Sequence, residues 1–510
     1  MITFSWIEIL LSLFSCLSVF LTPTVGSLNY HMGFYSNPYF PIAAASTLGF
    51  LLWLLLLVSR FALQAKKREM IDFVFVSLWM VIFSFFFFKH SPLGRYHPRI
   101  TEGVTLFLAF VLASYLIRWL NRKDLVRFIG LLSLAFLSAD FIQFRKLTVM
   151  EPRPAVSATP SAAPSPSIVH IVLDKFSYDN AALNHPQFEK KSLELAKKHQ
   201  LTFHTQHYSN YHATAFSVPD FLKDQRDLDA STGFRELNSN TLFHYFFKKG
   251  YDLYLYGHYL PYCLRFKALA KHCQINSREE AKAVFEFSKW AELYLTEFSS
   301  SINRIFNSEN SYQFLQRYPE NALQMFDDYR QDFKKWAQSS HPFYAYLHVV
   351  VPHDPFRLSQ DCELLPPIKK GMEIEEVRGR LQSQSLCVLK QLDIVLTSIK
   401  SQYPGPLKIL IHSDHGMFMR DNKSEKKENT KDAELNQLSH IPAWVSQENS
   451  QSPLRSDSLT SNSEVGAFLK GETPTLKSQT DIHFFAGCVN KRDPYKKNRF
   501  GPWASPNPKS

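Results

Sequence analysis

Five apolar stretches within the first 145 residues constrain the fold of this 510-residue chain more than any other feature. Each is close to the ~20 residues that a helix needs to cross the hydrocarbon core of a membrane. A single stretch of this kind is also typical of a buried helix in a globular protein, but five in succession favour membrane spans. The stretches are Phe4 to Leu21, Ile42 to Leu63, Met70 to Phe88, Val104 to Leu120 and Leu125 to Ile142.

Basic residues in the short loops predict the orientation of these spans. Residues 66–68, after the second stretch, are Lys-Lys-Arg, and residues 118–127, after the fourth, hold four basic side chains. Cytoplasmic loops carry such an excess of Lys and Arg, whereas residues 29–41, after the first stretch, have none. With the N-terminus inside, five crossings would place the remaining chain outside the cytoplasm.

The rest of the chain reads as a tether followed by one large α/β domain. Residues 146–167 include a run rich in Pro, Ala and Ser, a composition that cannot bury a core. Beyond it, apolar runs typical of strands alternate with helical patterns. We therefore predict a transmembrane helical domain over 1–145, a linker over 146–167 and an exported domain over 168–510 with a polar C-terminal tail. In that domain we expect a mostly parallel sheet covered by helices. The strand-like runs are Ile168 to Leu173, Tyr251 to Tyr256, Phe343 to Val351 and Leu407 to Ile411, and the helical patterns are Phe188 to His199, Ala322 to Gln338 and Glu373 to Lys400.

Five of the six cysteines lie in the exported part, where disulfides form. Cys263 and Cys273 are close together in a loop-like segment, and Cys362 and Cys387 flank the start of a helix. We therefore expect these two pairs and a free Cys488. Zinc binding by the thiols is the alternative, although no CxxC spacing occurs.

The formal net charge of +11 does not indicate a nucleic-acid partner. Much of the excess lies in the predicted cytoplasmic loops and the polar tail, where it can meet anionic lipid headgroups. No basic stripe interleaved with aromatic residues stands out. We expect the membrane, and no nucleic acid, as a partner.

Metal-type ligands follow three of the predicted strands. Asp174 comes after IVHIVL, His353 after FYAYLHVVV, and Asp414-His415 after LKILIH. Open parallel sheets bind ligands beyond the carboxyl ends of their strands, so these residues should converge. Asp174, Asp414 and His415 offer two carboxylates and an imidazole to a divalent cation, with zinc favoured and manganese or calcium as alternatives. Considered by itself, each carboxylate also has a structural alternative: Asp174 could cap a helix, and Asp414 could simply end its strand.

Two hydroxyl groups in the segment NYHATAFSVP, residues 210–219, are candidate nucleophiles. A cation would lower the pKa of a bound hydroxyl, which would make Thr214 both a metal ligand and the nucleophile. Ser217 is the alternative nucleophile. Both side chains could also cap the helix that follows, because Ser and Thr are favoured at that position.

These segments resemble the alkaline-phosphatase/sulfatase superfamily: IVLDKFSYD, TAFSVP, LHVVVPHDP and SDHG. The closest similarity is to membrane-anchored phosphoethanolamine and phosphoglycerol transferases, and among them to the lipid A phosphoethanolamine transferases, the family of the mobile colistin-resistance enzymes. Those enzymes also have five membrane helices and an exported α/β catalytic domain. The resemblance implies Thr214 as the nucleophile, His353 as a substrate-side or second-metal residue, and Asp414-His415 as a metal pair. His348 and His440 are further candidates for a second metal or the substrate, although His348 could equally sit in its strand with its ring hydrogen-bonded.

Three departures from those families are visible. The transferases have a Gly-Glu turn where this chain has Leu173-Asp174, and a cysteine pair around the nucleophile where it has Asn210 and Asp220. Formylglycine sulfatases need an arginine where it has Phe221.

The resemblance implies a metal-dependent transferase of the bacterial inner membrane, multi-pass, with its catalytic domain in the periplasm. It would move phosphoethanolamine or phosphoglycerol from a phospholipid donor to a lipid-linked or glycan acceptor, as in lipopolysaccharide modification, through a phospho-threonine. The alternatives are a membrane-anchored hydrolase of phosphate or sulfate esters and a non-catalytic envelope protein.

Overall fold

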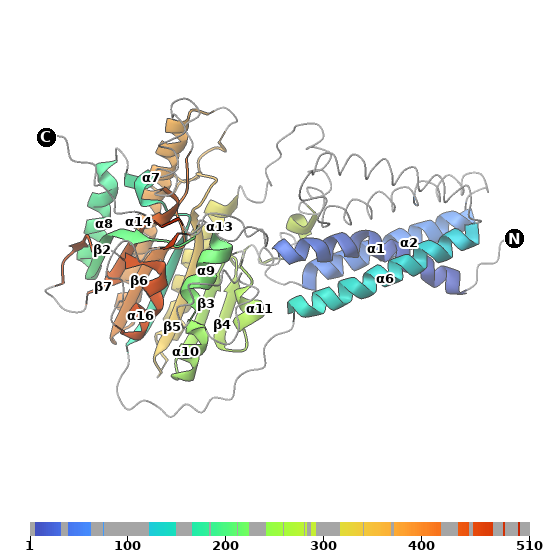
Figure 1. The fold of residues 1–510 in the computed structure, drawn as a ribbon, viewed down its shortest axis with the longest axis horizontal. Coiled ribbons are helices and arrows are strands. Elements are labelled where there is room, and N and C mark those ends of the chain that lie inside the picture. The colour runs from blue at the N-terminus through green and yellow to red at the C-terminus, as the bar shows by residue number, and fades with distance from the viewer. Residues whose placement is uncertain are drawn as a thin grey trace. The chain divides into compact units, whose positions relative to one another are not determined.

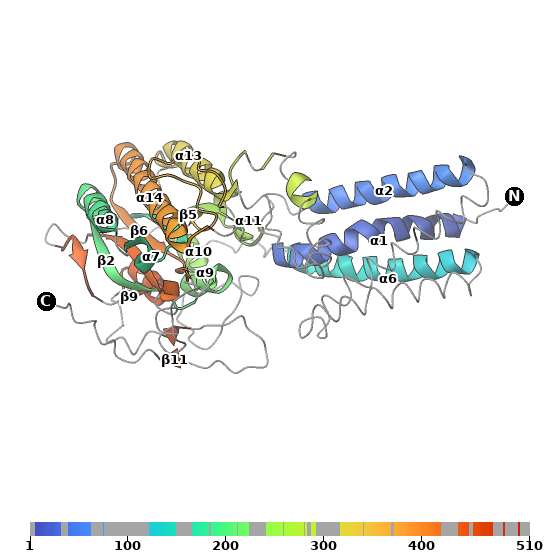
Figure 2. The same ribbon diagram turned by 90° about the horizontal axis from the view of Figure 1, so that it is seen from above.

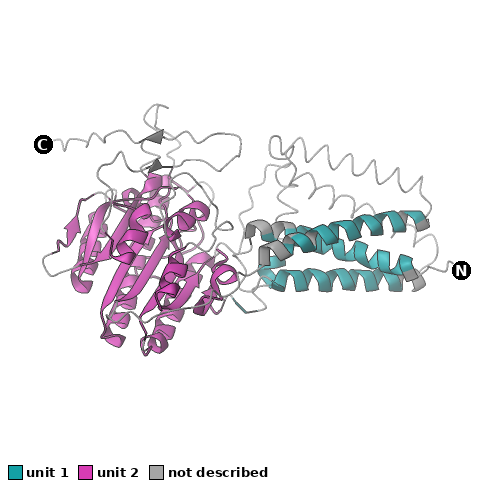
Figure 3. Ribbon diagram, turned by 60° about the horizontal axis from the view of Figure 1, so that its bottom comes forward, with its two compact units in different colours: residues 1–149, 281–314 teal, residues 150–280, 315–510 magenta. Residues whose placement is uncertain are grey.

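The chain forms two compact units, which Figure 3 shows in different colours. Unit 1 contains residues 1–149 and 281–314, and unit 2 contains residues 150–280 and 315–510. The computed structural model describes residues 6–31, 39–62, 75, 122–148, 166–182, 185–211, 213–223, 241–258, 260–279, 281–282, 287–291, 317–339, 341–368, 372–419, 437–447, 452–458, 460–472, 483–484 and 498–499. The predicted tether and Cys488 therefore lie almost wholly outside the described residues.

Unit 1 is helical. Its described helices are α1 (Trp6–His31), α2 (Tyr39–Ala62) and α6 (Arg122–Thr148). Within the described part, two stretches, Ile7–Val25 of α1 and Tyr39–Val58 of α2, are long and apolar enough to cross a membrane by length and composition. They correspond to the first two predicted stretches. The fifth falls in α6, whose apolar stretch, Arg127–Ala139, is shorter. The third and fourth lie outside the described residues, so a bundle of five spans stays a prediction.

Close packing and buried hydroxyl groups join the helices of unit 1. A Cβ atom on Gly130 of α6 would lie 2.3 Å from the Cβ of Leu11 in α1, so the two helices meet where one lacks a side chain. Ser18 of α1 hydrogen-bonds Ser133 of α6 at 3.2 Å. Small residues and interhelical hydrogen bonds are common contacts between helices that pack in a membrane.

Unit 2 is built on a nine-stranded sheet (Figure 1). The strand order is β4-β3-β5-β1-β6-β7-β2-β8, with β9 beside β2. All neighbouring pairs are parallel except those of β7, which runs antiparallel to both β6 and β2. The strands are β1 (Ser167–Asp174), β2 (Leu201–Tyr208), β3 (Asp252–Gly257), β4 (Ala270–Ile275), β5 (Phe343–Pro352), β6 (Leu407–Ser413), β7 (His440–Ser446), β8 (Arg455–Ser456) and β9 (Thr460–Ser461); β10 (His483–Phe484) and β11 (Asn498–Arg499) pair separately.

Helices cover both faces of this sheet. In Figure 2, α8, α14 and α13 lie on one face, while α9 and α10 lie on the other. All four predicted strands and all three predicted helices are present, and the expectation of a mostly parallel sheet in an α/β domain is confirmed. The helices are α7 (Tyr178–Ala182), α8 (Pro186–His199), α9 (Thr214–Leu222), α10 (Leu242–Lys248), α11 (Tyr262–Phe266), α13 (Tyr318–Trp336), α14 (Ile374–Gln402), the 3-10 helix η3 (Asn462–Glu464) and α16 (Val465–Lys470).

The central strands β1 and β5 are buried along their whole length, as continuous apolar runs between two helix layers must be. Side chains alternate between the faces, so residues two apart share a face. Tyr344, Tyr346 and His348 thus form a row on β5. The two tyrosines of this row pack in the aromatic core between the sheet and helices α9 and α10. The row ends at the carboxyl edge of the sheet, where Asp174 ends β1.

Candidate metal centre and active site

The first element of the site is the turn after β1. Asp174 is the last residue of β1 and its side chain is fully buried. The next residue, Lys175, has a φ of 63°, which turns the chain sharply. Its backbone N–H donates to Asp414 Oδ1 at 3.0 Å. The turn after β1 therefore orients the carboxylate of Asp414, which follows β6.

The second element is the Ser-Asp-His-Gly turn after β6. The backbone N–H of Asp414 donates to the Leu173 carbonyl oxygen at 3.0 Å, which continues the pairing of β1 and β6 past the strand end. The N–H of His415 donates to Asp414 Oδ1 at 2.7 Å. A Cβ atom on Gly416 would lie 2.1 Å from the Gln437 carbonyl oxygen, so the turn requires glycine there.

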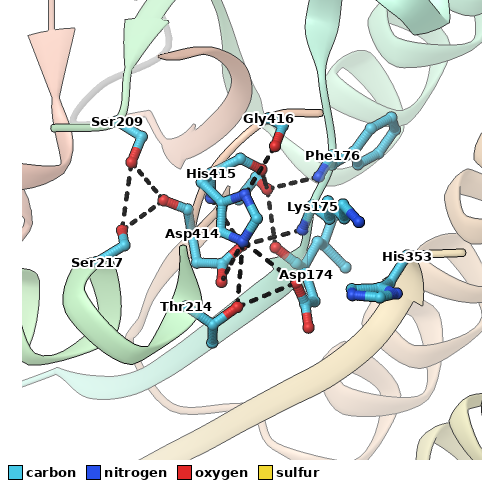
Figure 4. A network of polar contacts seen from close by, with 12 residues as sticks. Asp174, Lys175, Phe176, Ser209, Thr214, Ser217, His353, Asp414, His415 and Gly416 are labelled. Atoms are coloured by element: carbon cyan, nitrogen blue, oxygen red, sulfur yellow. Dashed lines mark hydrogen bonds and ion pairs between the residues drawn. The ribbon is translucent and has the colours of Figure 1, made fainter. Parts of the chain in front are cut away.

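The third element is Thr214, the first residue of α9 (Figure 4). Its Oγ1 lies 3.3 Å from Asp174 Oδ1 and 3.2 Å from His415 Nε2, and its side chain is buried. His415 Nδ1 lies 2.7 Å from the Gly416 carbonyl oxygen, which can only accept. The proton of a neutral His415 ring is thereby held on Nδ1, and the lone pair of Nε2 points to Thr214.

His348 joins this group from β5. Asp174, His348 and Asp414 each offer one ligand atom, and these three atoms lie within 4.8 Å of one another. The expected cation ligands Asp174 and Asp414 are thus brought together, and His348 is beside them. The ring of His348 is fully buried and its Nδ1 lies 2.9 Å from the Tyr262 hydroxyl. Both the strand position and the ring hydrogen bond considered for His348 from the sequence are present, so its structural role and its place beside the carboxylates coexist.

A divalent cation fits this set of donors. Two carboxylates with no exposed surface lie together, and burying such charge without a counter-charge is costly. Asp414 Oδ2 accepts no hydrogen bond among the described residues. Carboxylate oxygen and neutral imidazole nitrogen are ligands for zinc and, among oxygen-preferring cations, for manganese.

The protonation of these groups suits metal binding. Burial raises the pKa of Asp414, but the neighbouring His415 and His348 rings and two hydrogen bonds outweigh it, so the pKa of this carboxyl is lowered overall. Burial lowers the pKa of His348 to about 4, against the opposing pull of Asp414. At neutral pH the carboxyl is ionised and the ring is neutral, which are the forms that bind a cation.

Ser217 has a different role from Thr214. It is fully buried and donates to the backbone carbonyl oxygen of Asp414 at 2.5 Å. Ser209 Oγ and Asn462 Nδ2 donate to the same oxygen at 2.5 and 2.9 Å. The suggestion that Thr214 and Ser217 cap α9 was wrong, because the N-cap residue is Ala213 and no side chain caps the helix.

His353 lies past the end of β5 at the edge of the centre (Figure 4). Its Nδ1 is 3.2 Å from Asp354 Oδ1, and Lys175 Nζ is 2.5 Å from the same oxygen. Burial, and then the charge of Lys175, lower the pKa of His353 to about 4. His353 and Lys175 thus meet at Asp354, at the rim of the centre.

His440 is held elsewhere. Its Nδ1 is 2.7 Å from Asp179 Oδ1 and its Nε2 is 2.6 Å from the Thr205 carbonyl oxygen. Both ring nitrogens are therefore engaged at the start of β7, and His440 is outside the carboxylate group described here.

The two disulfides have the pairing expected from the sequence. Cys263 of α11 is joined to Cys273 of β4, and Cys362 is joined to Cys387 of α14. Neither bond involves the metal centre, and thiol ligands for zinc are therefore not supplied by these four residues.

Three residues of the site went unnoticed in the sequence: Lys175, Ser209 and Asn462. Lys175 could have been suspected because it directly follows Asp174. Ser209 and Asn462 carry no local signal, since each acts by donating to a carbonyl oxygen more than 40 residues away along the chain.

Two carboxylates, two imidazoles and a buried threonine hydroxyl are thus gathered at the strand ends of an α/β domain. The sulfatase family model matches residues 166–469, which is more than half of the chain. The chain therefore belongs to the sulfatase family, within the alkaline-phosphatase superfamily.

Similar solved structures include two periplasmic domains and a hydrolase. One is the C-terminal periplasmic domain of EptC from Escherichia coli in a complex with zinc, at 12% identity and a TM-score of 0.41, covering 62% of this chain and 84% of that chain. A second is the periplasmic domain of the phosphoethanolamine transferase EptC from Campylobacter jejuni, at 15% identity and a TM-score of 0.37, covering 62% and 92%. A third is the phosphonate monoester hydrolase of Agrobacterium radiobacter, at 12% identity and a TM-score of 0.40, covering 64% and 82%. No curated protein matches the chain in sequence.

Proposed function

We propose that this protein is a membrane-bound, metal-dependent transferase that moves a substituted phosphate, phosphoethanolamine or phosphoglycerol, from a phospholipid to a cell-envelope acceptor. The observation that carries the proposal is the position of Thr214 Oγ1, which lies within 3.3 Å of both a buried carboxylate and the Nε2 of a histidine with a fixed tautomer. A buried hydroxyl beside the strand-end carboxylates of a sulfatase-family domain supports the choice of Thr214 as the nucleophile.

Asp174, Asp414 and His415, with His348 beside them, would hold the cation, zinc in preference to manganese or calcium. When bound, such a cation lowers the pKa of a hydroxyl ligand and neutralises charge on a phosphate. The Thr214 hydroxyl donates to Asp174 Oδ1, and this carboxylate would orient the hydroxyl and receive its proton, while the Nε2 lone pair of His415 is left for the cation. The start of α9 presents backbone N–H groups to the anionic phosphate.

The transfer takes two steps. In the first, Thr214 Oγ1 bonds to phosphorus, the bond from phosphorus to the diglyceride oxygen breaks, and that oxygen receives a proton. His353 at the rim is the proton source we propose, because an anionic phosphate beside its ring raises the pKa that burial and Lys175 have lowered. In the second, the hydroxyl oxygen of a lipid-linked sugar or other glycan bonds to phosphorus and its proton passes to His353. The bond from phosphorus to Thr214 Oγ1 then breaks, and Oγ1 takes its proton back from Asp174.

Membrane attachment favours a lipid donor over a soluble ester. Two helices long enough to cross a membrane precede the catalytic domain, so donor and enzyme share one surface. We propose a multi-pass protein of the bacterial inner membrane, with five spans, its catalytic domain in the periplasm and no nucleic-acid partner.

Intact-mass spectrometry tests the proposal. The full chain, in nanodiscs of phosphatidylethanolamine and phosphatidylglycerol with added zinc, is acid-quenched and weighed beside Thr214→Ala and the matched control Ser217→Ala. We expect the mass of phosphoethanolamine or phosphoglycerol on the wild type and on Ser217→Ala, and none on Thr214→Ala, with diglyceride released in the same samples.

Other results would redirect the assignment. An adduct on Thr214→Ala that Ser217→Ala lacks would make Ser217 the nucleophile. Hydrolysis of soluble phosphate or sulfate esters, with no diglyceride released, would indicate a hydrolase. No turnover and no bound metal would leave a non-catalytic envelope protein.

A further inference from the structure

The chain leaves the catalytic unit in mid-sequence and returns to the helical unit. Residues 281–314, here called the returning segment, belong to unit 1, although residues 150–280 and 315–510 on either side belong to unit 2 (Figure 3). The chain therefore passes between the units three times instead of once. A tether alone would need only the first of these connections.

A hydrogen bond fastens the returning segment to α1. The indole Nε1 of Trp290 donates to Thr24 Oγ1 at 3.1 Å, and both side chains are buried. The hydroxyl of Thr24 itself donates to the Phe20 carbonyl oxygen at 2.7 Å. The hydroxyl proton of Thr24 is thus used within α1, and an oxygen lone pair of Thr24 accepts the indole N–H of Trp290.

The position of Thr24 gives the level of this contact relative to a membrane. Thr24 is the last residue but one of the apolar stretch Ile7–Val25. In Figures 1 and 2 the short helix at residues 287–291 lies at the end of the bundle where α1 ends and α2 begins. The indole therefore lies where an apolar span ends, which is the level of the lipid headgroups.

Other aromatic side chains gather at the same end of unit 1. Phe287 is 46% exposed, and its ring centroid is 5.6 Å from that of Trp290. Tyr39, which begins α2, is 54% exposed and packs edge-on against Phe144 near the end of α6, at 5.6 Å between centroids. Aromatic residues of this kind form belts at the boundary between headgroups and acyl chains.

We propose that residues 287–291 of the returning segment form a second membrane anchor, in which Phe287 inserts between the headgroups of the adjacent phospholipid leaflet, while Trp290 fastens these residues to α1. This inference rests on the membrane attachment in the proposed function and is independent of the transfer chemistry. The lipid is preferred to a second protein because Phe287 is exposed in the same unit as Tyr39 and Leu55 of α2, which are also apolar and exposed on a helix long enough to cross a membrane.

The anchor would have a consequence for catalysis. Chain connections at 149–150, 280–281 and 314–315 restrict how far the catalytic unit can travel from the leaflet. A lipid donor and its acceptor lie in that leaflet, so the restriction raises their effective concentration at the active site.

Depth measurement by electron paramagnetic resonance tests the proposal. Nitroxide labels are placed one at a time at Phe287→Cys, Leu55→Cys and Glu194→Cys in the full chain, with Cys16→Ser and Cys488→Ala to remove other thiols. The protein is held in nanodiscs of phosphatidylethanolamine and phosphatidylglycerol, and relaxation by oxygen and by a water-soluble nickel chelate is compared. Leu55 reports the hydrocarbon, and Glu194 of α8, 49% exposed, reports water.

We expect the label at 287 to fall between the two references, with strong relaxation by oxygen and weakened relaxation by nickel. Relaxation at 287 equal to that at 194 overturns the anchor while leaving membrane attachment intact. Protection from both reagents indicates a protein partner, such as a second copy, and also overturns it. If the label at 55 behaves as in water, membrane attachment itself fails and the anchor fails with it.

A second variant tests the fastening without altering Phe287. Trp290→Phe keeps the ring but removes the indole donor, and Trp53→Phe is the matched control, because Trp53 Nε1 donates to Ser12 Oγ at the same 3.1 Å within unit 1. We expect Trp290→Phe, and not Trp53→Phe, to increase the mobility of a label at the exposed Ser288→Cys. Equal mobility in the two variants would refute the fastening.

Discussion

Replacing Asn462 by alanine should destabilise the catalytic domain and weaken metal binding together. Asn462 is fully buried in η3, and its Nδ2 donates to the carbonyl oxygens of Ser413 and Asp414 at 3.1 and 2.9 Å. Its Oδ1 lies 3.0 Å from His207 Nε2. One amide therefore ties the turn that presents the metal ligands to a buried histidine on β2.

The size of the stability loss depends on which hydrogen-bond partners Asn462→Ala leaves unsatisfied. The Asp414 oxygen keeps its two serine donors, and the Ser413 oxygen keeps His412 Nδ1 at 2.8 Å. His207 Nε2 loses the partner that Asn462 provides, which costs about 1–3 kcal/mol, and the missing amide leaves a small cavity. We expect a loss of about 3 kcal/mol for Asn462→Ala.

Ser217→Ala is the matched control. It also removes a donor to the Asp414 oxygen, but Ser209 and Asn462 remain, so the cost should be about 1 kcal/mol. Thermal unfolding of the full chain gives the order of stabilities, and calorimetric titration of the metal-free protein with zinc gives the affinities. Metal affinity should fall clearly for Asn462→Ala and little for Ser217→Ala.

An equal or reversed order of the two variants, in stability or in zinc affinity, would refute this reasoning. It would mean that the carbonyl oxygen of Asp414, and not the link to His207, governs the turn. A loss of stability with unchanged zinc affinity would show that Asn462 supports the fold without positioning the ligands.

Three further predictions concern the rim, the sheet and a disulfide. Lys175→Met removes a cation 2.5 Å from Asp354 at the rim, so we expect KM for an anionic substrate to rise about tenfold in steady-state assays. Because the charge of Lys175 lowers the pKa of His353, the pH dependence of kcat should move to higher pH in this variant, and an unchanged KM would contradict the prediction. Burial lowers the pKa of His204 to about 4, so the folded state resists a proton that the unfolded chain accepts below pH ~6.5. Stability should therefore be complete above that pH and fall by about 2 kcal/mol from pH 7 to 5 through this residue, and His204→Gln should show a smaller fall in urea unfolding. Replacing Cys362 and Cys387 by serine opens a loop with a sequence separation of 25 and should cost about 3 kcal/mol in the same assay, while an unchanged midpoint would show that the bond does not constrain the unfolded chain.

The elements of the catalytic domain could be predicted because their signals are local. Continuous apolar runs such as the one ending at Leu173 are typical of buried strands between helix layers, and the amphipathic pattern before Lys400 is typical of a helix on their surface. The antiparallel strand β7 was not predicted. Its partners β2 and β6 are distant in sequence, and a short run such as His440–Ser446 has no pattern that fixes its direction.

The residues of the candidate site also fall into those that the sequence could predict and those that it could not. Asp174, Asp414 and His415 could be proposed from the sequence because topology brings the ends of parallel strands together, whatever the details of packing. His348 was left with an open role, since only the register of β5 beside β1 shows that its row of side chains ends at the carboxylates. His440 could not be placed until the tertiary structure showed both of its ring nitrogens engaged at Asp179 and Thr205.

The sequence by itself therefore determined the class of fold, the strand ends that carry the ligands and the disulfide pairs, because each depends on residue type and spacing along the chain. The tertiary structure alone decided which hydroxyl faces the ligands and which supports them. Thr214 and Ser217 are three residues apart on one short helix and are chemically almost alike. Only the packing of α9 against the turn after β6 directs Thr214 to Asp174 and His415, and Ser217 to the backbone carbonyl of Asp414.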